Sequence, residues 1–273
     1  KSITFSDGIT NQITFFRNEK GATKTILMLP ALGVKASYYD SFCTYFADNG
    51  YHMVSMDWRG LGYSSVRASR KVDFGYKDFL NDISEVIELI KRELPNASLY
   101  LAGHSLGGQL GALYLSRFPK AAKGLFAIAC CSIYYKGWTG RERLPILVAG
   151  ALFAPISSVV GYLPGKQLGF GGKEFRGVIK DWLFTLKTGK YAPKGDNWQQ
   201  ALAAWAELKT DADATFDATV VLQASDIAPQ LTWGTNPGQV VAIDQLVPNP
   251  AEETNSTVRS SIEKALEYVD LSA

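Results

Sequence analysis

The chain has 273 residues, 47% of them hydrophobic and 20% charged, which is enough apolar material for a sizeable folded core and excludes a disordered chain. The net charge is +2, but residues 1–194 carry 25 Lys/Arg against 14 Asp/Glu, whereas residues 195–273 carry 3 against 12. The basic residues are scattered and form no nucleic-acid motif, so we expect no nucleic-acid partner. We interpret this change from a basic to an acidic segment as a join between segments of different origin.

Two further observations bear on location. The three cysteines, Cys43, Cys130 and Cys131, are odd in number and give no disulfide framework, and no signal peptide opens the sequence, so a reducing, cytoplasmic location is expected. The uncharged stretch at residues 144–165 is interrupted by three prolines and three glycines. These residues disfavour a continuous helix, so we expect a buried or cap segment and no membrane span.

The first part of the chain alternates strand and helix patterns. Strand patterns occupy residues 1–6, 12–17, 25–29 and 51–56, and helix patterns occupy residues 37–49 and 79–94. A further continuous apolar run at residues 124–131 predicts a buried strand. Strands that alternate with helices in this way predict an α/β fold with a parallel sheet.

Residues 99–108 read LYLAGHSLGG, a short apolar run followed by a sharp turn and a helix pattern over residues 106–117. A serine at such a strained strand-to-helix turn needs glycines beside it, because a Cβ there would collide with its neighbours. The pattern predicts that Ser105 is held out at the sheet edge as a nucleophile. Free N–H groups at the helix N-terminus would lie beside it and could stabilise an oxyanion.

In this strand-turn-helix setting, G-H-S-L-G resembles the nucleophile elbow of the α/β-hydrolase superfamily, and D-W-R-G-L-G-Y-S at residues 57–64 resembles a loop of the same family. The resemblance covers residues 1 to about 190. It implies the α/β-hydrolase fold, a mostly parallel sheet with helices on both faces, plus a cap at about residues 132–190. Asp57 is expected to brace its loop. Trp138, Phe153 and Trp182 become candidate pocket walls.

The family also implies a chemistry, the hydrolysis of carboxylic esters or related small acyl compounds without cofactor or metal. Ser105 would be the nucleophile, and the backbone N–H groups of Leu32 and Leu106 would form the oxyanion hole. Pro30 and Ala31 stand where the family commonly has His-Gly, but a peptide N–H donates whatever side chain it carries.

The histidine count opposes this chemistry. In this fold the catalytic groups follow the chain order Ser, Asp or Glu, His, but the sequence contains only His52 and His104. We expect His52 to be structural and His104 to point away from Ser105. Without a general base the rate should fall by on the order of 10² to 10⁴.

Residues 191–251 resemble an internal segment of the large subunit of 3-isopropylmalate dehydratase, a member of the aconitase family, most specifically at TWGTNPGQ (residues 232–239). SIEKALEYVDL (residues 261–271) continues the resemblance as an amphipathic helix. That family holds an iron–sulfur cluster with three cysteines, and none lies in residues 191–273. The resemblance therefore implies ancestry rather than activity. We predict two domains, 1–190 and 191–273, joined as a fusion that replaces the C-terminal strands of the hydrolase fold.

Three functions stay open at this point. The first is a serine hydrolase, for which Asp226 would be the triad acid if residues 216–222 form the next strand of the hydrolase sheet. The second is a non-catalytic hydrolase-like scaffold joined to a dehydratase-derived segment. The third is dehydratase chemistry, which lacks its cluster ligands.

Overall fold

The computed structural model describes residues 1–130, 132–191, 230–233, 239–242 and 244–269. The chain divides into two compact units, residues 1–209 and 210–273. The predicted helix at residues 197–208, the predicted strand at 216–222 and Asp226 lie outside the described residues. The predicted domain boundary near residue 191 therefore stays a prediction.

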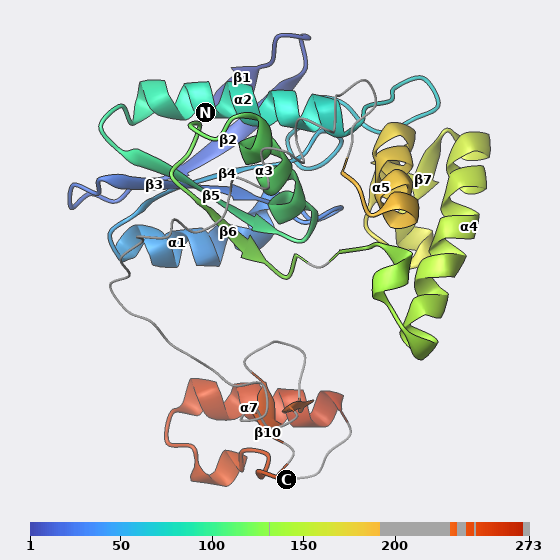
Figure 1. Ribbon diagram of the computed structural model, residues 1–273. Helices are drawn as coiled ribbons and strands as arrows, with labels where there is room; N and C mark the ends of the chain where they lie inside the picture. Colours follow the sequence, from blue (N-terminus) through green and yellow to red (C-terminus); the bar gives the residue numbers. More distant parts are fainter. Residues whose placement is uncertain (131, 192–229, 234–238, 243, 270–273) are drawn as a thin grey trace, which may run out of the picture. The chain divides into compact units, whose positions relative to one another are not determined.

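The first unit is built on a six-stranded sheet with the order β1-β2-β4-β3-β5-β6 (Figure 1). The strands are β1 (Ser2–Thr4), β2 (Thr10–Phe16), β3 (Lys24–Leu29), β4 (His52–Met56), β5 (Ser98–His104) and β6 (Leu125–Ile128). The last four are parallel to one another, and β1 and β2 add an antiparallel hairpin at one edge. The α/β class, the mostly parallel sheet and the two N-terminal strands predicted from the sequence are confirmed.

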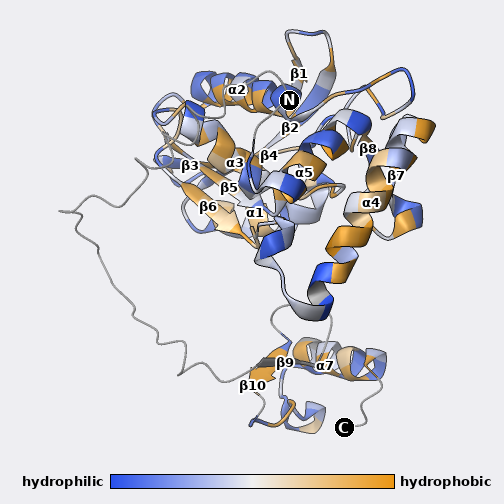
Figure 2. Ribbon diagram, turned by 45° about the vertical axis from the view of Figure 1, so that its right-hand side comes forward, coloured by the Kyte–Doolittle hydropathy of each residue, from blue (hydrophilic) through white to orange (hydrophobic). Residues whose placement is uncertain are grey.

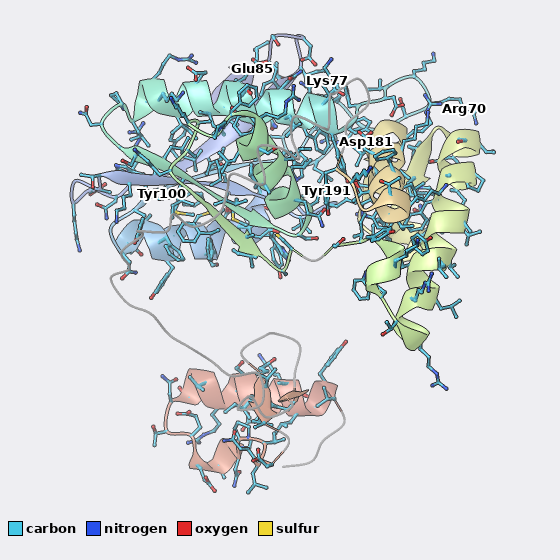
Figure 3. The ribbon with its side chains drawn as sticks, viewed as in Figure 1. Arg70, Lys77, Glu85, Tyr100, Asp181 and Tyr191 are labelled. Carbon is cyan, nitrogen blue, oxygen red and sulfur yellow. The ribbon has the colours of Figure 1, made fainter. Side chains whose placement is uncertain are left out.

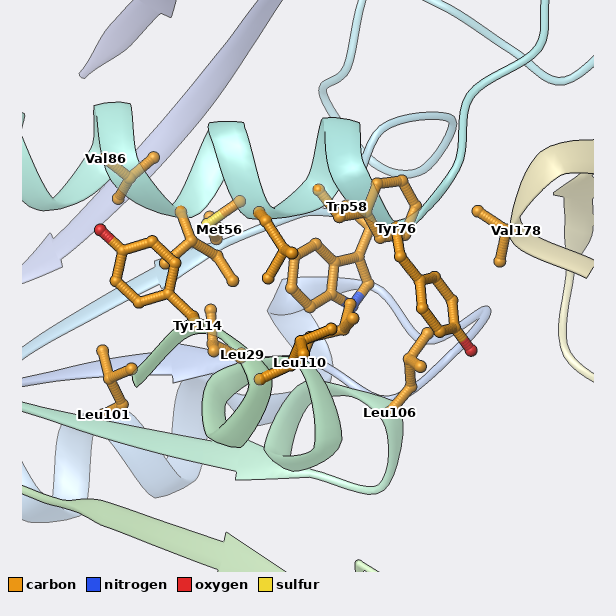
Figure 4. Close-up of a cluster of buried hydrophobic side chains, with 14 of the residues drawn as sticks. Leu29, Met56, Trp58, Tyr76, Val86, Leu101, Leu106, Leu110, Tyr114 and Val178 are labelled. Carbon is orange, nitrogen blue, oxygen red and sulfur yellow. The ribbon is translucent and has the colours of Figure 1, made fainter. Parts of the chain in front are cut away.

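Helices cover both faces of this sheet (Figure 1). The short helix η1 (Ala36–Tyr39) and α1 (Asp40–Asp48) lie on one face, and α2 (Tyr76–Glu93) and α3 (Leu106–Arg117) lie on the other. The larger core fills the space beneath α2 and α3, where Trp58 stacks on Phe79 with ring centroids 5.0 Å apart (Figure 4). Fully burying side chains of this size stabilises the fold by about 1.5–3 kcal/mol each.

The expectation that residues 124–131 form a buried strand is wrong. Phe126 and Ile128 of β6 are 54% and 40% exposed, and within the described residues β6 pairs only with β5. An apolar run is buried only if other elements cover it, and no described element follows β6 in this sheet. The sheet therefore ends at an uncovered apolar strand.

A cap follows the sheet. It comprises η2 (Tyr135–Gly137), η3 (Gly140–Glu142), α4 (Arg143–Val160), β7 (Tyr162–Pro164), η4 (Gly165–Leu168), β8 (Lys173–Phe175) and α5 (Arg176–Thr188). The strands β7 and β8 form an antiparallel pair. The cap is fixed to the sheet unit through α5, because Gly177 N donates to Asp73 Oδ1 at 2.7 Å and Tyr76 N donates to Asp181 Oδ2 at 2.7 Å (Figure 3).

Among the described helices, α4 alone is long and apolar enough to cross a membrane, by length and composition only. The expectation that prolines and glycines disfavour a continuous helix in this stretch is wrong, because α4 runs without a break through Gly150 and Pro155. Only 11% of its apolar window is buried.

The second unit contains an antiparallel pair, β9 (Gln230–Thr232) and β10 (Val240–Ala242), then η6 (Pro250–Glu252) and α7 (Ser256–Tyr268). Trp233 packs against Ile262, Ala265 and Leu266 of α7. The predicted amphipathic helix is confirmed, although it begins at Ser256 rather than Ser261.

Candidate active site

Ser105 occupies the turn between β5 and α3. Its backbone has φ 51° and ψ −115°, a conformation that residues with a Cβ rarely adopt and that persists only when the surroundings enforce it. The neighbouring glycines allow the turn, because a Cβ on Gly107 would overlap the carbonyl oxygen of Leu29, and one on Gly103 would overlap the backbone of Gly107 and Gly108. The elbow pattern in the sequence thus reports a real steric requirement.

Ser105 lines a cavity of about 170 Å³. Both backbone positions predicted for the oxyanion hole, Leu32 and Leu106, line the same cavity. The remaining lining residues are Ala31, Gln109, Ile133, Phe170, Gly171 and Trp182. None of these side chains is titratable, so the described part of the chain offers no acid or base in the cavity.

The aromatic wall of the cavity comes from the cap. Trp182, predicted as a pocket wall, lines the cavity with Phe170, and their ring centroids are 5.3 Å apart. Phe153 lies one layer behind, against both rings. Trp138 is not among the lining residues, and its Nε1 donates to Ser132 O at 3.0 Å. Phe170 was not predicted from the sequence, where it stands in a glycine-rich stretch without periodicity.

The loop that carries Leu32 is held from two sides. Trp58 Nε1 donates to Pro30 O at 2.8 Å, and Ala31 N donates to the Tyr39 hydroxyl oxygen at 3.0 Å. The N–H groups of Leu32 and Leu106 donate to no described residue. Two donors that have no acceptor among the described residues, on residues that line the same cavity as Ser105, match what stabilisation of an oxyanion requires.

Neither histidine serves Ser105. His104 Nδ1 lies 2.8 Å from the Tyr39 hydroxyl, which can donate to it, and the imidazole lines a different cavity, beside Lys35. His52 begins β4, and its Nδ1 accepts the N–H of Asn18 at 3.1 Å. Burial lowers the pKa of His52. Both histidines therefore lie where the sequence predicted, and Ser105 has no imidazole partner.

Asp57 braces its loop, as expected. Its Oδ1 accepts the N–H of Ala36 at 2.8 Å and its Oδ2 accepts the N–H of Tyr63 at 3.2 Å. The carboxylate is committed to these backbone donors and does not line the cavity of Ser105.

Sequence reasoning missed two buried carboxyl groups. Asp82 is fully buried and bound by Arg59, and burial raises the pKa of Asp82 to about 7, although the hydrogen bonds from Arg59 oppose the rise. Glu174, 4% exposed, accepts the N–H of Gly172 at 2.7 Å, and burial raises its pKa as well. Gly172 follows Gly171 of the cavity wall, yet Glu174 itself is not a lining residue. No local sequence pattern marks either carboxyl.

Two family models match the chain. Residues 20–150 match the family described as serine aminopeptidase, S33, and residues 178–273 match the aconitase family (aconitate hydratase). The first match agrees with the α/β-hydrolase fold and the elbow described above, so the N-terminal part of this chain is similar to the α/β hydrolases. The second match supports the fusion-like segment predicted at the C-terminal end.

Solved structures resemble the chain in part. A carboxylesterase from Nitrososphaera gargenis is 12% identical with a TM-score of 0.49, and the match covers 75% of this chain and 76% of that one. A soluble variant of monoglyceride lipase from Saccharomyces cerevisiae is 16% identical with a TM-score of 0.46, covering 60% and 52%. Epoxide hydrolase VrEH1 from Vigna radiata is 21% identical with a TM-score of 0.38, covering 46% and 37%. The chain thus spans half or less of the length of several hydrolases that it resembles.

Proposed function

We propose that this protein hydrolyses small carboxylic esters slowly through Ser105. One observation carries the proposal. Ser105, in the strained elbow conformation, lines the same small cavity as Leu32 and Leu106, whose N–H groups donate to no described residue. Strain at a turn of this kind is typical of functional sites, because the surrounding structure must maintain it.

The chemistry follows from these groups. The Ser105 oxygen attacks the ester carbonyl carbon, and the carbonyl oxygen becomes an oxyanion that accepts the N–H groups of Leu32 and Leu106. The bond to the alcohol oxygen then breaks and the alcohol leaves with a proton. Water attacks the acyl-enzyme, releases the carboxylic acid and restores the serine. One missing oxyanion donor typically costs 10² to 10³ in rate, so two fixed donors are a substantial part of the catalysis.

The described residues that line the cavity include no basic side chain for the proton of Ser105, so we assign its transfer to water or hydroxide. Positioned general bases contribute about 10² to 10⁴ in rate, and turnover should be lower than that of a complete triad by a factor of this order. The apolar wall of Ile133, Phe170 and Trp182 favours a short acyl group, since a cavity of about 170 Å³ is small.

The test is labelling of the full chain with a fluorophosphonate probe, read by intact mass, with turnover of a short p-nitrophenyl ester measured in parallel. We expect slow labelling of one site that disappears in Ser105→Ala. The matched control is Ser37→Ala, a serine that lines the neighbouring cavity of His104 and should label as the unaltered protein does. Labelling that persists in Ser105→Ala contradicts the proposal.

The second candidate is a non-catalytic hydrolase-like scaffold joined to an aconitase-like segment. The absence of any titratable side chain among the residues that line the cavity favours it. The same experiment separates the two candidates, because a folded protein that is neither labelled nor active above its Ser105→Ala variant has the elbow without its chemistry.

A further inference from the structure

The cap helix α4 (Arg143–Val160) is apolar on both of its faces, yet only one face is covered. The inner face, which includes Ile146, Ala149 and Phe153, packs towards the core and α5. The outer face is coloured as hydrophobic along much of its length in Figure 2. A helix that is hydrophobic all round normally lies in a protein core or in lipid, so the outer face of α4 lacks an expected partner.

The exposed residues of α4 form one stripe. Leu144 is 63% exposed, Leu147 41%, Val148 46%, Leu152 48% and Val159 72%. The pairs 144/147, 144/148, 148/152 and 152/159 are three, four or seven residues apart, so these residues lie on one broad side of the helix. Contiguous apolar surface of this kind marks a contact site for a membrane or another macromolecule.

The charges around the stripe are basic. Residues 144–165 contain no charged side chain, and Arg141, Glu142 and Arg143 stand directly before them, with a net charge of +1. At the other end of α4, Arg70 donates from its guanidinium to the carbonyl oxygen of Val159 at 2.5 Å (Figure 3). Residues 132–190 together carry nine Lys/Arg against three Asp/Glu, and one of these acids, Glu174, is buried. An apolar stripe between basic ends matches the surface of an anionic bilayer.

We propose that α4 binds to the surface of anionic lipid bilayers and lies in the plane of the interface. A membrane-spanning position does not fit the packing, because the inner face would have to leave Phe170 and Trp182, which contact Phe153. A second copy of the chain fits less well than lipid. Both ends of α4 are basic, so parallel and antiparallel pairing would each bring like charges together.

This binding does not depend on the proposed esterase activity. None of the stripe residues is among the described residues that line the cavity of Ser105. Vesicle binding by Ser105→Ala should therefore equal that of the unaltered protein. Failure of one proposal leaves the other intact.

The experiment is co-sedimentation of the full chain with phosphatidylcholine vesicles, with and without phosphatidylglycerol, at low and physiological salt. We expect binding to the phosphatidylglycerol vesicles that weakens with salt. The double variant Val148→Ser/Leu152→Ser should bind about tenfold or more weakly, since it removes two large apolar side chains from the interface. Arg141→Gln should bind about fivefold more weakly, as expected for one basic residue near an anionic surface.

The matched control is Tyr63→Ser, which removes a side chain of similar exposure, 64%, from a loop of the sheet unit. It should bind as the unaltered protein does, and urea unfolding should show that every variant is folded. Absence of vesicle binding, equal binding to vesicles without phosphatidylglycerol, or equal loss in Tyr63→Ser would overturn the proposal. The proposal would also be overturned if the protein did not bind vesicles but formed a dimer that dissociates when Val148→Ser/Leu152→Ser is introduced.

Discussion

Replacing Arg59 by methionine should strongly destabilise the first unit. The Arg59 side chain is 2% exposed and fully engaged. Its Nε donates to Asp82 Oδ2 at 2.6 Å, a second nitrogen donates to Asp82 Oδ1 at 2.5 Å, and the third donates to Asp7. The guanidinium carbon also lies 5.3 Å and 4.7 Å from the ring centroids of Phe5 and Phe74.

The loss in the free energy of unfolding depends on the interactions that Asp82 and the two rings keep after Arg59→Met. Removing one partner of a buried ion pair typically costs 3–5 kcal/mol because the other charge stays buried. The ring contacts add about 0.5–1 kcal/mol each, and methionine restores part of the packing. Burial already raises the pKa of Asp82 to about 7, so without Arg59 this carboxyl would become protonated near neutral pH and limit the penalty. We therefore expect a loss of about 3 kcal/mol, a large fraction of the 5–15 kcal/mol of a typical domain.

Urea unfolding followed by tryptophan fluorescence measures this loss, because Trp58 lies in the same core. Arg59→Met/Asp82→Leu should recover most of the stability, since it removes both charges together. The matched control is Arg17→Met, which breaks an exposed pair with Glu93 and should leave the urea midpoint nearly unchanged. If Arg59→Met is as mild as Arg17→Met, or if the double variant is no more stable than Arg59→Met, the reasoning is refuted.

Three further predictions follow from the same structure. The folded-state pKa of Asp82 is raised from 3.8 to about 7, so the folded protein holds this proton more tightly than the unfolded chain. The resulting stabilisation is fully present below about pH 4 and is lost as pH rises through 7. Urea midpoints should show this fall, and Asp82→Asn should remove it. Gly107→Ala should cost about 1–3 kcal/mol and abolish fluorophosphonate labelling, because its Cβ would overlap Leu29 O, whereas unchanged labelling would contradict the assigned geometry. The rate of Ser105 labelling should rise with pH without an inflection near 6.5, and such an inflection would reveal an imidazole base.

The features predicted correctly are those that local patterns encode. Apolar runs and helical spacing predicted the alternating elements, and strands that are joined by helices pair in parallel, so the parallel sheet follows. The elbow was recognisable because its requirement is steric and confined to five residues around Ser105. The loop position of Leu32 could be predicted because it directly follows a central strand.

The features missed depend on contacts between distant segments. Arg59 and Asp82 are 23 residues apart, and nothing near either residue indicates that they pair. Phe170 reaches the cavity only because the cap folds back over the elbow. The burial of Phe126 was predicted from hydrophobicity, but burial also needs a covering element. The cytoplasmic location and the roles of Ser105 and Asp226 stay predictions.

The missing histidine and the uncovered strand have a common explanation. In the hydrolase order, the acid and the histidine follow the nucleophile on later elements, and those elements also extend the sheet beyond the strand that corresponds to β6. In this chain the hydrolase match ends at residue 150 and the aconitase match begins at residue 178. That second match starts inside α5, although Gly177 and Asp181 fix α5 to the sheet unit and Trp182 lines the cavity of Ser105. Helix α5 is therefore packed as part of the hydrolase-like unit, although the aconitase match begins within it. We interpret the change from one match to the other as the reason why no histidine follows Ser105 and why no described strand pairs with the outer edge of β6.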